Sequence, residues 1–161
     1  MSVEASLPVQ IGEVKIGRAG QSLNAILGSC IGLGFLHRDK GLYGLAHCLL
    51  ANSGGQQSNK GDGRHVDQAI LTLLREMEIS DKEKRRVQVF IAGGANMTLP
   101  AETEAKRLVG RVNADFARKA LRDAKLRIMR DDTGGQNGRR VTINCTTGEF
   151  TIEFIPRLGA H

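Results

Sequence analysis

The stretch that decides the fold is residues 28–50, which read GSCIGLGFLHRDKGLYGLAHCLL. Apolar residues alternate with glycine along Ile31–His37, and Leu42–Leu50 forms a second apolar run. Alternation with a period of two is typical of a strand. The polar segment Arg38–Gly41 between the runs has the composition of a hairpin turn. The stretch therefore predicts two neighbouring strands.

The same stretch carries a candidate catalytic pair. Cys30 follows a Gly-Ser turn, and His47 lies on the returning apolar run. A thiol needs a base to become a good nucleophile near neutral pH, and histidine is the usual base. Neighbouring residues of a strand point to opposite faces, so Cys48 should face away if His47 faces the site. Cys30 and His47 can meet only if the two strands pair.

Elsewhere, short apolar runs and helical patterns follow one another. The predicted strands are Ile11–Ile16, Leu23–Leu27, Val87–Ile91, Leu126–Met129 and a C-terminal hairpin that turns at Thr147 and Gly148. Helical spacing predicts helices over Arg64–Met77 and Leu108–Ala124, the second with Val109, Val112, Phe116 and Ala120 facing the core. Polar, glycine-rich composition predicts a loop over Asn52–Gly63 and a turn over Asp131–Gly138.

This order of elements sets the expected architecture. The chain has 161 residues, which fits one domain. Strands come first, and then helix, strand, helix and strands follow without regular alternation, which favours an α+β fold with mixed or antiparallel sheets. Residues 1–10 are expected to form a flexible N-terminal arm, and residues 11–161 the single domain.

Composition limits the class of partner. The net charge of +6 suits an acidic partner without naming one. Only five Phe, one Tyr and no Trp are present, which argues against a surface that stacks nucleic-acid bases. Three cysteines are too few for a disulfide framework, and no run approaches the roughly 20 apolar residues of a membrane span. A cytoplasmic protein with reduced thiols and no membrane insertion is expected.

Two competing chemistries find little support in the motifs. A metal site is not expected because no C-x-x-C or H-x-x-x-H spacing occurs. The glycine-rich segments around Gly93, Gly134 and Gly54 match neither phosphate-binding pattern. They are read either as tight turns or as backbone amides that line a cleft and stabilise an oxyanion.

Four blocks together resemble the CheD family of chemoreceptor glutamine deamidases. They are 27–32 (LGSCIG), 44–50 (GLAHCLL), 92–97 (AGGANM) and 132–139 (DTGGQNGR). The resemblance covers about Ile11 to Phe154 and implies a single-domain α/β/β layered sandwich, distantly similar to the deamidating domain of cytotoxic necrotising factors. It also implies hydrolysis of glutamine side chains to glutamate on methyl-accepting chemotaxis receptors, without a metal or cofactor.

The resemblance also implies roles for individual residues and partners. Cys30 falls on the family's nucleophile and His47 on its base, with Gly28, Ser29 and Ser53 expected around the substrate cleft. The family's third catalytic position is usually threonine and is Asn24 here, which we expect to orient the imidazole through its side-chain amide. A CheC-type chemotaxis phosphatase is the implied second partner. The alternative function is therefore a weakly catalytic or non-catalytic protein that binds and regulates such a phosphatase.

Overall fold

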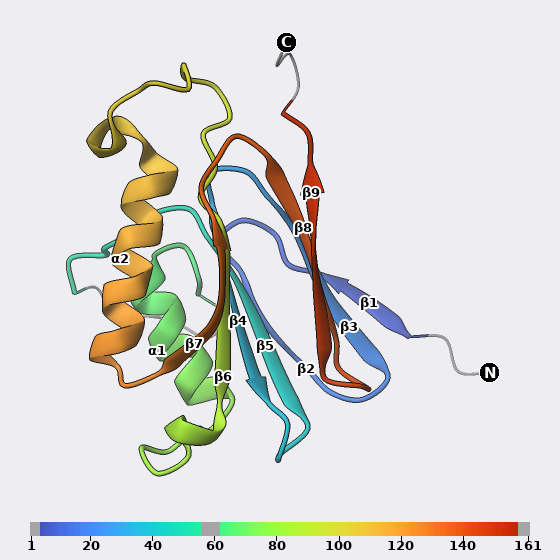
Figure 1. Ribbon diagram of the computed structural model, residues 1–161. Helices are drawn as coiled ribbons and strands as arrows, with labels where there is room; N and C mark the ends of the chain where they lie inside the picture. Colours follow the sequence, from blue (N-terminus) through green and yellow to red (C-terminus); the bar gives the residue numbers. More distant parts are fainter. Residues whose placement is uncertain (1–3, 56–61, 158–161) are drawn as a thin grey trace.

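The computed structural model describes residues 4–55 and 62–157, so residues 56–61 of the expected loop lie outside the described part. The chain forms three layers, in which two helices cover one face of a five-stranded sheet and a four-stranded sheet covers the other (Figure 1). The helices are α1 (Val66–Glu76) and α2 (Val109–Asp123). The arrangement confirms the predicted α+β sandwich with mixed sheets.

The chain crosses several times between the two sheets. The five-stranded sheet contains, in spatial order, β2 (Val14–Gly17), β5 (Leu42–Cys48), β4 (Ile31–His37), β6 (Gln88–Gly93) and β7 (Arg127–Thr133). The four-stranded sheet contains β1 (Ala5–Pro8), β3 (Gln21–Leu27), β8 (Gly138–Asn144) and β9 (Glu149–Ile155). Neighbouring strands are antiparallel except for β1 with β3 and β6 with β7. Short 3₁₀ turns lie at Lys84–Arg86 and Ala105–Arg107.

The predicted hairpin is confirmed and occupies the centre of the larger sheet. β4 pairs with β5 in antiparallel register, with Gly32 opposite His47. Odd-numbered β4 residues such as Leu33 pack toward the helices, whereas Gly32 and Gly34 face the second sheet. A Cβ at Gly32 would lie 2.7 Å from Leu27 Cδ1, and one at Gly34 would collide with the Phe90 ring. The glycine alternation therefore makes room for the core between the sheets.

The N-terminal segment differs from the expected flexible arm. Ala5–Pro8 forms β1, which pairs in parallel with β3, and Val9 is buried between the sheets. The sequence of this strand shows no apolar alternation, because three of its four side chains are exposed and its strand structure comes from backbone pairing. Residues 1–3 lie outside the described part.

The buried face of α2 is rotated from the predicted one, although Phe116 and Ala120 pack against the core as predicted. Val109 and Val112 are 55% and 45% exposed, whereas Ala114 and Ala117 are buried. Gly110 explains the rotation, since a Cβ there would lie 2.5 Å from the Gly94 backbone. Small residues let the helix approach the sheet closely, and this gain in packing outweighs the burial of the two valines.

Strand β7 is longer than predicted. It runs to Thr133, through the first three residues of the segment expected to be a turn, and residues 134–137 connect it to β8. Its charged side chains form ion pairs on an edge strand, such as Arg118 with Asp131, so the segment lacks an apolar pattern.

Candidate functional site

Cys30 lies where the chain crosses from one sheet to the other. Gly28–Cys30 connects the end of β3 to the start of β4, so the thiol lies beside the core between the sheets. Gly94 N–H donates to the Cys30 carbonyl (2.9 Å) and Ala95 N–H to the Gly28 carbonyl (3.0 Å). Gly93 has a φ of 98°, and a Cβ there would collide with the Cys30 carbonyl. The glycine-rich segment after β6 therefore fixes the cysteine turn.

His47 lies on β5 and faces the same layer. Its ring atom Nδ1 is 3.0 Å from the Val9 carbonyl oxygen. A carbonyl only accepts hydrogen bonds, so Nδ1 carries the hydrogen. In the neutral ring, Nε2 is then the basic atom, and no hydrogen bond from Nε2 to a described residue is present.

The strand register and the core contacts place the two candidate residues in the same layer. His47 is opposite Gly32 and faces the second sheet. Cys30 precedes β4 by one residue and belongs to the apolar cluster between the two sheets, which is the layer that His47 faces. Cys48 packs in the core beneath the helices, as predicted. Among the described residues, the Cys30 thiol and the His47 ring are not joined by a hydrogen bond, and both side chains are largely buried.

The electrostatics favour a neutral pair at rest. Burial raises the pKa of the Cys30 thiol. Burial also lowers the pKa of His47, and the Val9 hydrogen bond and the charge of Glu13 oppose that shift. A neutral thiol and a neutral imidazole can exchange a proton when an electrophile arrives, and this fits general-base activation better than a preformed thiolate.

The Asn24 side chain does not reach His47 in the structure. Asn24 lies between Leu23 and Ala25, which face the inner core, so its own side chain is on the outer face of β3. There its Nδ2 donates to Ser6 Oγ (2.8 Å). The ring partner is instead the Val9 carbonyl, a main-chain group that no side-chain pattern signals.

The expected cleft residues separate into two places. Ser29 lines a hollow of about 160 Å³ with the segment Ala95–Leu99 and the start of α2, and Gly28 lies beneath it near Met97. Ser53 lies before α1, where its N–H and hydroxyl donate to the two carboxylate oxygens of Asp67 (2.9 and 2.6 Å). The structure therefore associates Gly28 and Ser29 with the hollow, and Ser53 with the start of α1.

The glycine-rich segments act mainly as tight turns. Gly94, Ala95 and Asn96 each donate their N–H to a backbone carbonyl, so these groups are not free for an oxyanion. The N–H groups of Ser29 and Cys30, by contrast, have no acceptor among the described residues.

Two arginines that the sequence analysis did not single out support this region. Arg139 is buried and donates to the carbonyls of Gly134 and Asn137, which holds the connection from β7 to β8. Arg157 donates to the carbonyls of Asn96 and Leu99, in the wall of the hollow beside Ser29.

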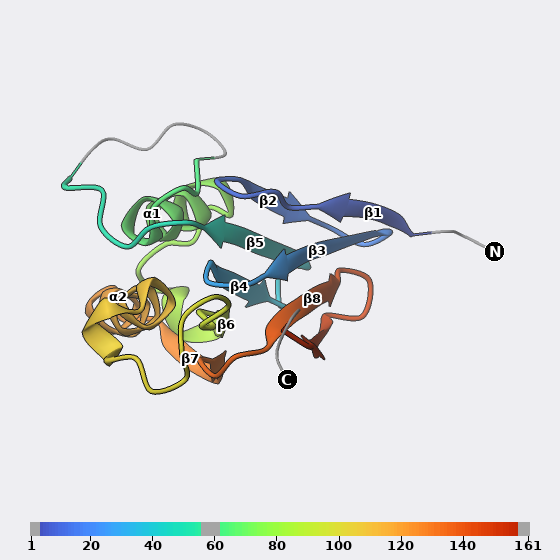
Figure 2. The same cartoon turned by 90° about the horizontal axis from the view of Figure 1, so that it is seen from above.

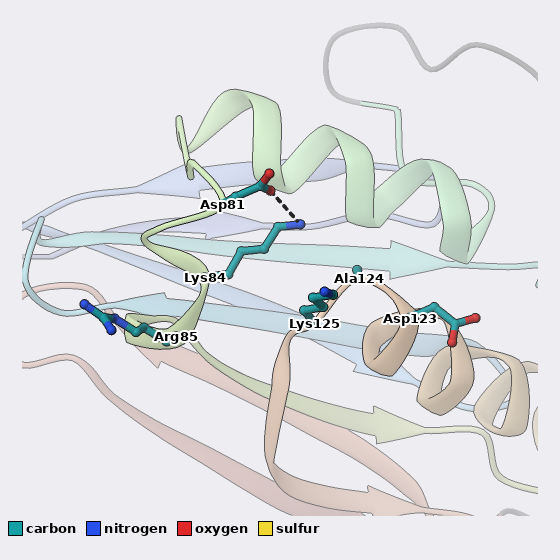
Figure 3. Close-up of a pocket in the computed structure, with 6 residues that line it drawn as sticks. All are labelled: Asp81, Lys84, Arg85, Asp123, Ala124 and Lys125. Carbon is teal, nitrogen blue, oxygen red and sulfur yellow. Dashed lines mark ion pairs between the residues drawn. The ribbon is translucent and has the colours of Figure 1, made fainter.

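The other end of the large sheet carries a hollow of a different kind. It measures about 490 Å³ and lies between the Lys84–Arg86 turn and the end of α2 (Figure 3). Lys84, Arg85 and Lys125 line it together with two aspartates, and Lys84 pairs with Asp81 at 3.1 Å. It contains no nucleophile beside a base.

Within residues 4–55 and 62–157, no group of three or more His, Cys, Asp or Glu could hold a metal ion, and no helix could span a membrane.

Comparison with known proteins gives a consistent family. Residues 49–154 match the family described as CheD chemotactic sensory transduction. A Ruegeria protein named probable chemoreceptor glutamine deamidase CheD 2 is 53% identical over 98% of this chain and 97% of its own length. Proteins named probable chemoreceptor glutamine deamidase CheD from Methanococcus vannielii and Bdellovibrio bacteriovorus are 33% and 30% identical, over 91% and 92% of this chain and 93% and 94% of their own.

Among solved structures, the Bacillus licheniformis hypothetical protein YfiH is similar with a TM-score of 0.46 and 14% identity, over 82% of this chain and 60% of that one, too low to support an argument. The family match covers residues 49–154, and the matches to the relatives extend over at least 91% of the chain. The chain belongs to the CheD family.

Proposed function

We propose that this protein hydrolyses the side-chain amides of selected glutamines on methyl-accepting chemotaxis receptors, with Cys30 as nucleophile and His47 as base. The observation that supports the proposal is that His47 on β5 faces the layer between the sheets, to which Cys30 also belongs, while Nε2 of the ring has no hydrogen bond to a described residue. The names of the relatives, probable chemoreceptor glutamine deamidase, support the same reaction and substrate.

His47 takes up and releases a proton in each half of the reaction. Nε2 takes the Cys30 proton as the sulfur attacks the amide carbon, and the protonated ring then gives that proton to the departing nitrogen as ammonia leaves. His47 next deprotonates a water that attacks the thioester, and the Cys30 thiol is released with a glutamate product. The backbone N–H groups of Ser29 and Cys30, which have no acceptor among the described residues, can donate to the oxyanion of the tetrahedral intermediate. One well-placed donor of this kind stabilises the transition state by about 3–4 kcal/mol.

The surface beside Cys30 suits a helical, acidic substrate. The 160 Å³ hollow at Ser29 shares Arg107 and Val109 with a neighbouring hollow of about 320 Å³. Leu50, Val109 and Val112 are exposed there, next to Lys106 and Arg107. An apolar strip with basic margins complements the Glu- and Gln-rich coiled coil expected of the receptors' cytoplasmic region, and charge complementarity raises the encounter rate.

The test is deamidation of receptor in isolated membranes, read by mass spectrometry of receptor peptides and by ammonia release. Cys30→Ala should abolish both signals. Cys145→Ala, which also deletes a buried thiol, is the matched control and should remain active. Equal activity of the Cys30→Ala and unaltered proteins would contradict the proposal.

The alternative is a weakly catalytic protein that binds and regulates a CheC-type phosphatase. Its supporting observation is the enclosed resting site, where the Cys30 thiol is buried and makes no hydrogen bond to His47. It predicts binding of the phosphatase by both unaltered and Cys30→Ala proteins, with no deamidation by either.

A further inference from the structure

The segment between β1 and β2 holds His47 by three hydrogen bonds. Gly12 N–H donates to the His47 carbonyl (2.8 Å), and His47 N–H donates to the Glu13 carbonyl (3.0 Å). The third bond runs from the ring Nδ1 to the Val9 carbonyl (3.0 Å). Two bonds therefore fix the strand, and the third fixes the ring.

Val9 is itself held in place from both sides. Its side chain is 2% exposed in the core between the sheets, and its N–H donates to the Asn24 carbonyl at 2.7 Å. The preceding strand β1 pairs with β3, and the Asn24 side chain joins that pair through Ser6. The Val9 carbonyl cannot turn away from His47 without disturbing these contacts.

We propose that the Val9 carbonyl is the positioning group for the catalytic histidine, which it fixes in the tautomer with hydrogen on Nδ1 so that Nε2 can accept the Cys30 proton. The inference rests on the proposed function of Cys30 and His47. Position 24 contributes through its main-chain carbonyl, which holds Val9, and through the attachment of β1, rather than through a side-chain contact with the ring.

The chemistry of a carbonyl fits this role. In the other tautomer, the lone pair of Nδ1 would face the lone pairs of the Val9 oxygen at 3.0 Å, which is repulsive. A carbonyl is also uncharged, so it orients the ring with a weaker bias toward the protonated form than a carboxylate would exert. The ring is thereby oriented and remains a base.

The direct test weakens this one acceptor in the full-length chain. A synthetic peptide of residues 1–29 can be ligated to expressed residues 30–161 through the native Cys30, with an ester in place of the Val9–Gln10 amide. An ester carbonyl accepts hydrogen bonds more weakly than the amide carbonyl that it replaces. Histidine ¹⁵N labelling of the expressed part then reports the tautomer of His47 by NMR, and receptor deamidation reports kcat and KM.

The ligated all-amide protein should show hydrogen on Nδ1 of His47. The ester should give a mixture of tautomers and a kcat lower by about five- to tenfold, the scale of one hydrogen bond, with KM changed less than about twofold. An ester protein with the tautomer and kcat of the amide protein would overturn the proposal.

Two controls isolate the acceptor. The ester also removes the Gln10 N–H, which donates to the Glu13 carboxylate (2.8 Å). Glu13→Ala removes that same bond but keeps the Val9 amide carbonyl, and it should keep the Nδ1 tautomer. An ester at the exposed Arg18–Ala19 linkage should also have no effect. If Glu13→Ala reproduces the effect of the Val9 ester, the proposal fails.

One outcome separates this proposal from the proposed function. If the ester shifts the tautomer of His47 but even the all-amide protein does not deamidate receptors, the proposed function is overturned and positioning by Val9 is still supported.

Discussion

Two buried histidines lie on neighbouring central strands of the same sheet, and their partners differ. His47 on β5 donates from Nδ1 to an uncharged carbonyl at 3.0 Å and keeps Nε2 as a base. His37, at the end of β4, is 3.0 Å from the Glu83 carboxylate, which Lys40 also contacts at 2.8 Å. β4 and β5 lie between the helices and the second sheet (Figure 2). His47 faces the second sheet, and His37 is on the face that packs toward the helices.

The difference shows that burial alone does not identify a catalytic histidine. His37 is 1% exposed and His47 5%, so exposure cannot separate them. The carboxylate partner engages Nε2 of His37 in an ion-pair cluster, and Nδ1 of that ring has no partner among the described residues. The carbonyl partner of His47 leaves a basic nitrogen in the layer to which Cys30 also belongs. The partner of each ring, together with a neighbouring nucleophile, separates a structural histidine from a candidate base.

The largest effect is expected from the same substitution at the two histidines. His47→Ala should lower kcat for receptor deamidation by at least about 100-fold, since a positioned base contributes about 10²–10⁴ in rate. His37→Ala should keep activity within about threefold while it lowers the melting temperature. Deamidation kinetics and thermal unfolding of both variants provide the measurement. Substantial activity in His47→Ala would mean that another group is the base.

The three thiols sharpen the comparison by reactivity. Cys30 is 6% exposed and adjoins the hollow at Ser29, whereas Cys48 is fully buried with a pKa raised far above its usual range, and burial raises the pKa of Cys145 to about 11. Iodoacetamide should label Cys30 at least about tenfold faster than either other thiol. Because burial raises the pKa of Cys30, the labelling rate should still increase with pH above 8. Peptide mass mapping measures the order, and faster labelling of Cys48 would count against the assignment.

The ion-pair cluster at the His37 end should contribute to stability in a pH-dependent way. Hydrogen bonds from Lys40 and His37 lower the pKa of Glu83 from 4.5 to about 2. A lowered carboxyl pKa stabilises the folded state above pH 4.5, and this contribution is lost as the pH falls toward 2. Glu83→Gln should therefore lower the melting temperature by a few degrees at pH 7 and make progressively less difference under acidic conditions.

The control for Glu83 is a more exposed pair. Glu153→Gln removes the partner of Arg140, which is 3.7 Å away on the outer face of the small sheet. Such a pair contributes little, so the melting temperature should change by less than about one degree. Equal shifts for the two variants would show that the cluster around His37 has no special role.

The smallest effect is expected at Asn24. Its side chain contacts Ser6 and not His47, so Asn24→Ala should change kcat by no more than about twofold, the cost of one exposed hydrogen bond. Asn24→Thr, which restores the family's usual residue, should likewise change kcat by no more than about twofold, because the side chain at position 24 points outward. A large loss of kcat in Asn24→Ala at unchanged KM would show that the side chain itself orients the base.

Much of this protein follows from its sequence alone. The alternation in residues 28–50 predicts the central hairpin, because glycine and apolar side chains repeat with the period of a strand. The hairpin in turn predicts that Cys30 and His47 share one face while Cys48 does not. The order of helices and strands predicts the α+β class, and four short blocks indicate the CheD family.

Only the tertiary structure decided the groups that act through the backbone. The role of Val9 depends on a carbonyl, which every residue has, so no pattern of side chains can predict it. Strand β1 is ordered by pairing with β3, and the face of α2 is chosen by the close approach of Gly110 to Gly94. These features come from contacts between segments far apart in the chain, whereas local periodicity reports only which residues can share a face.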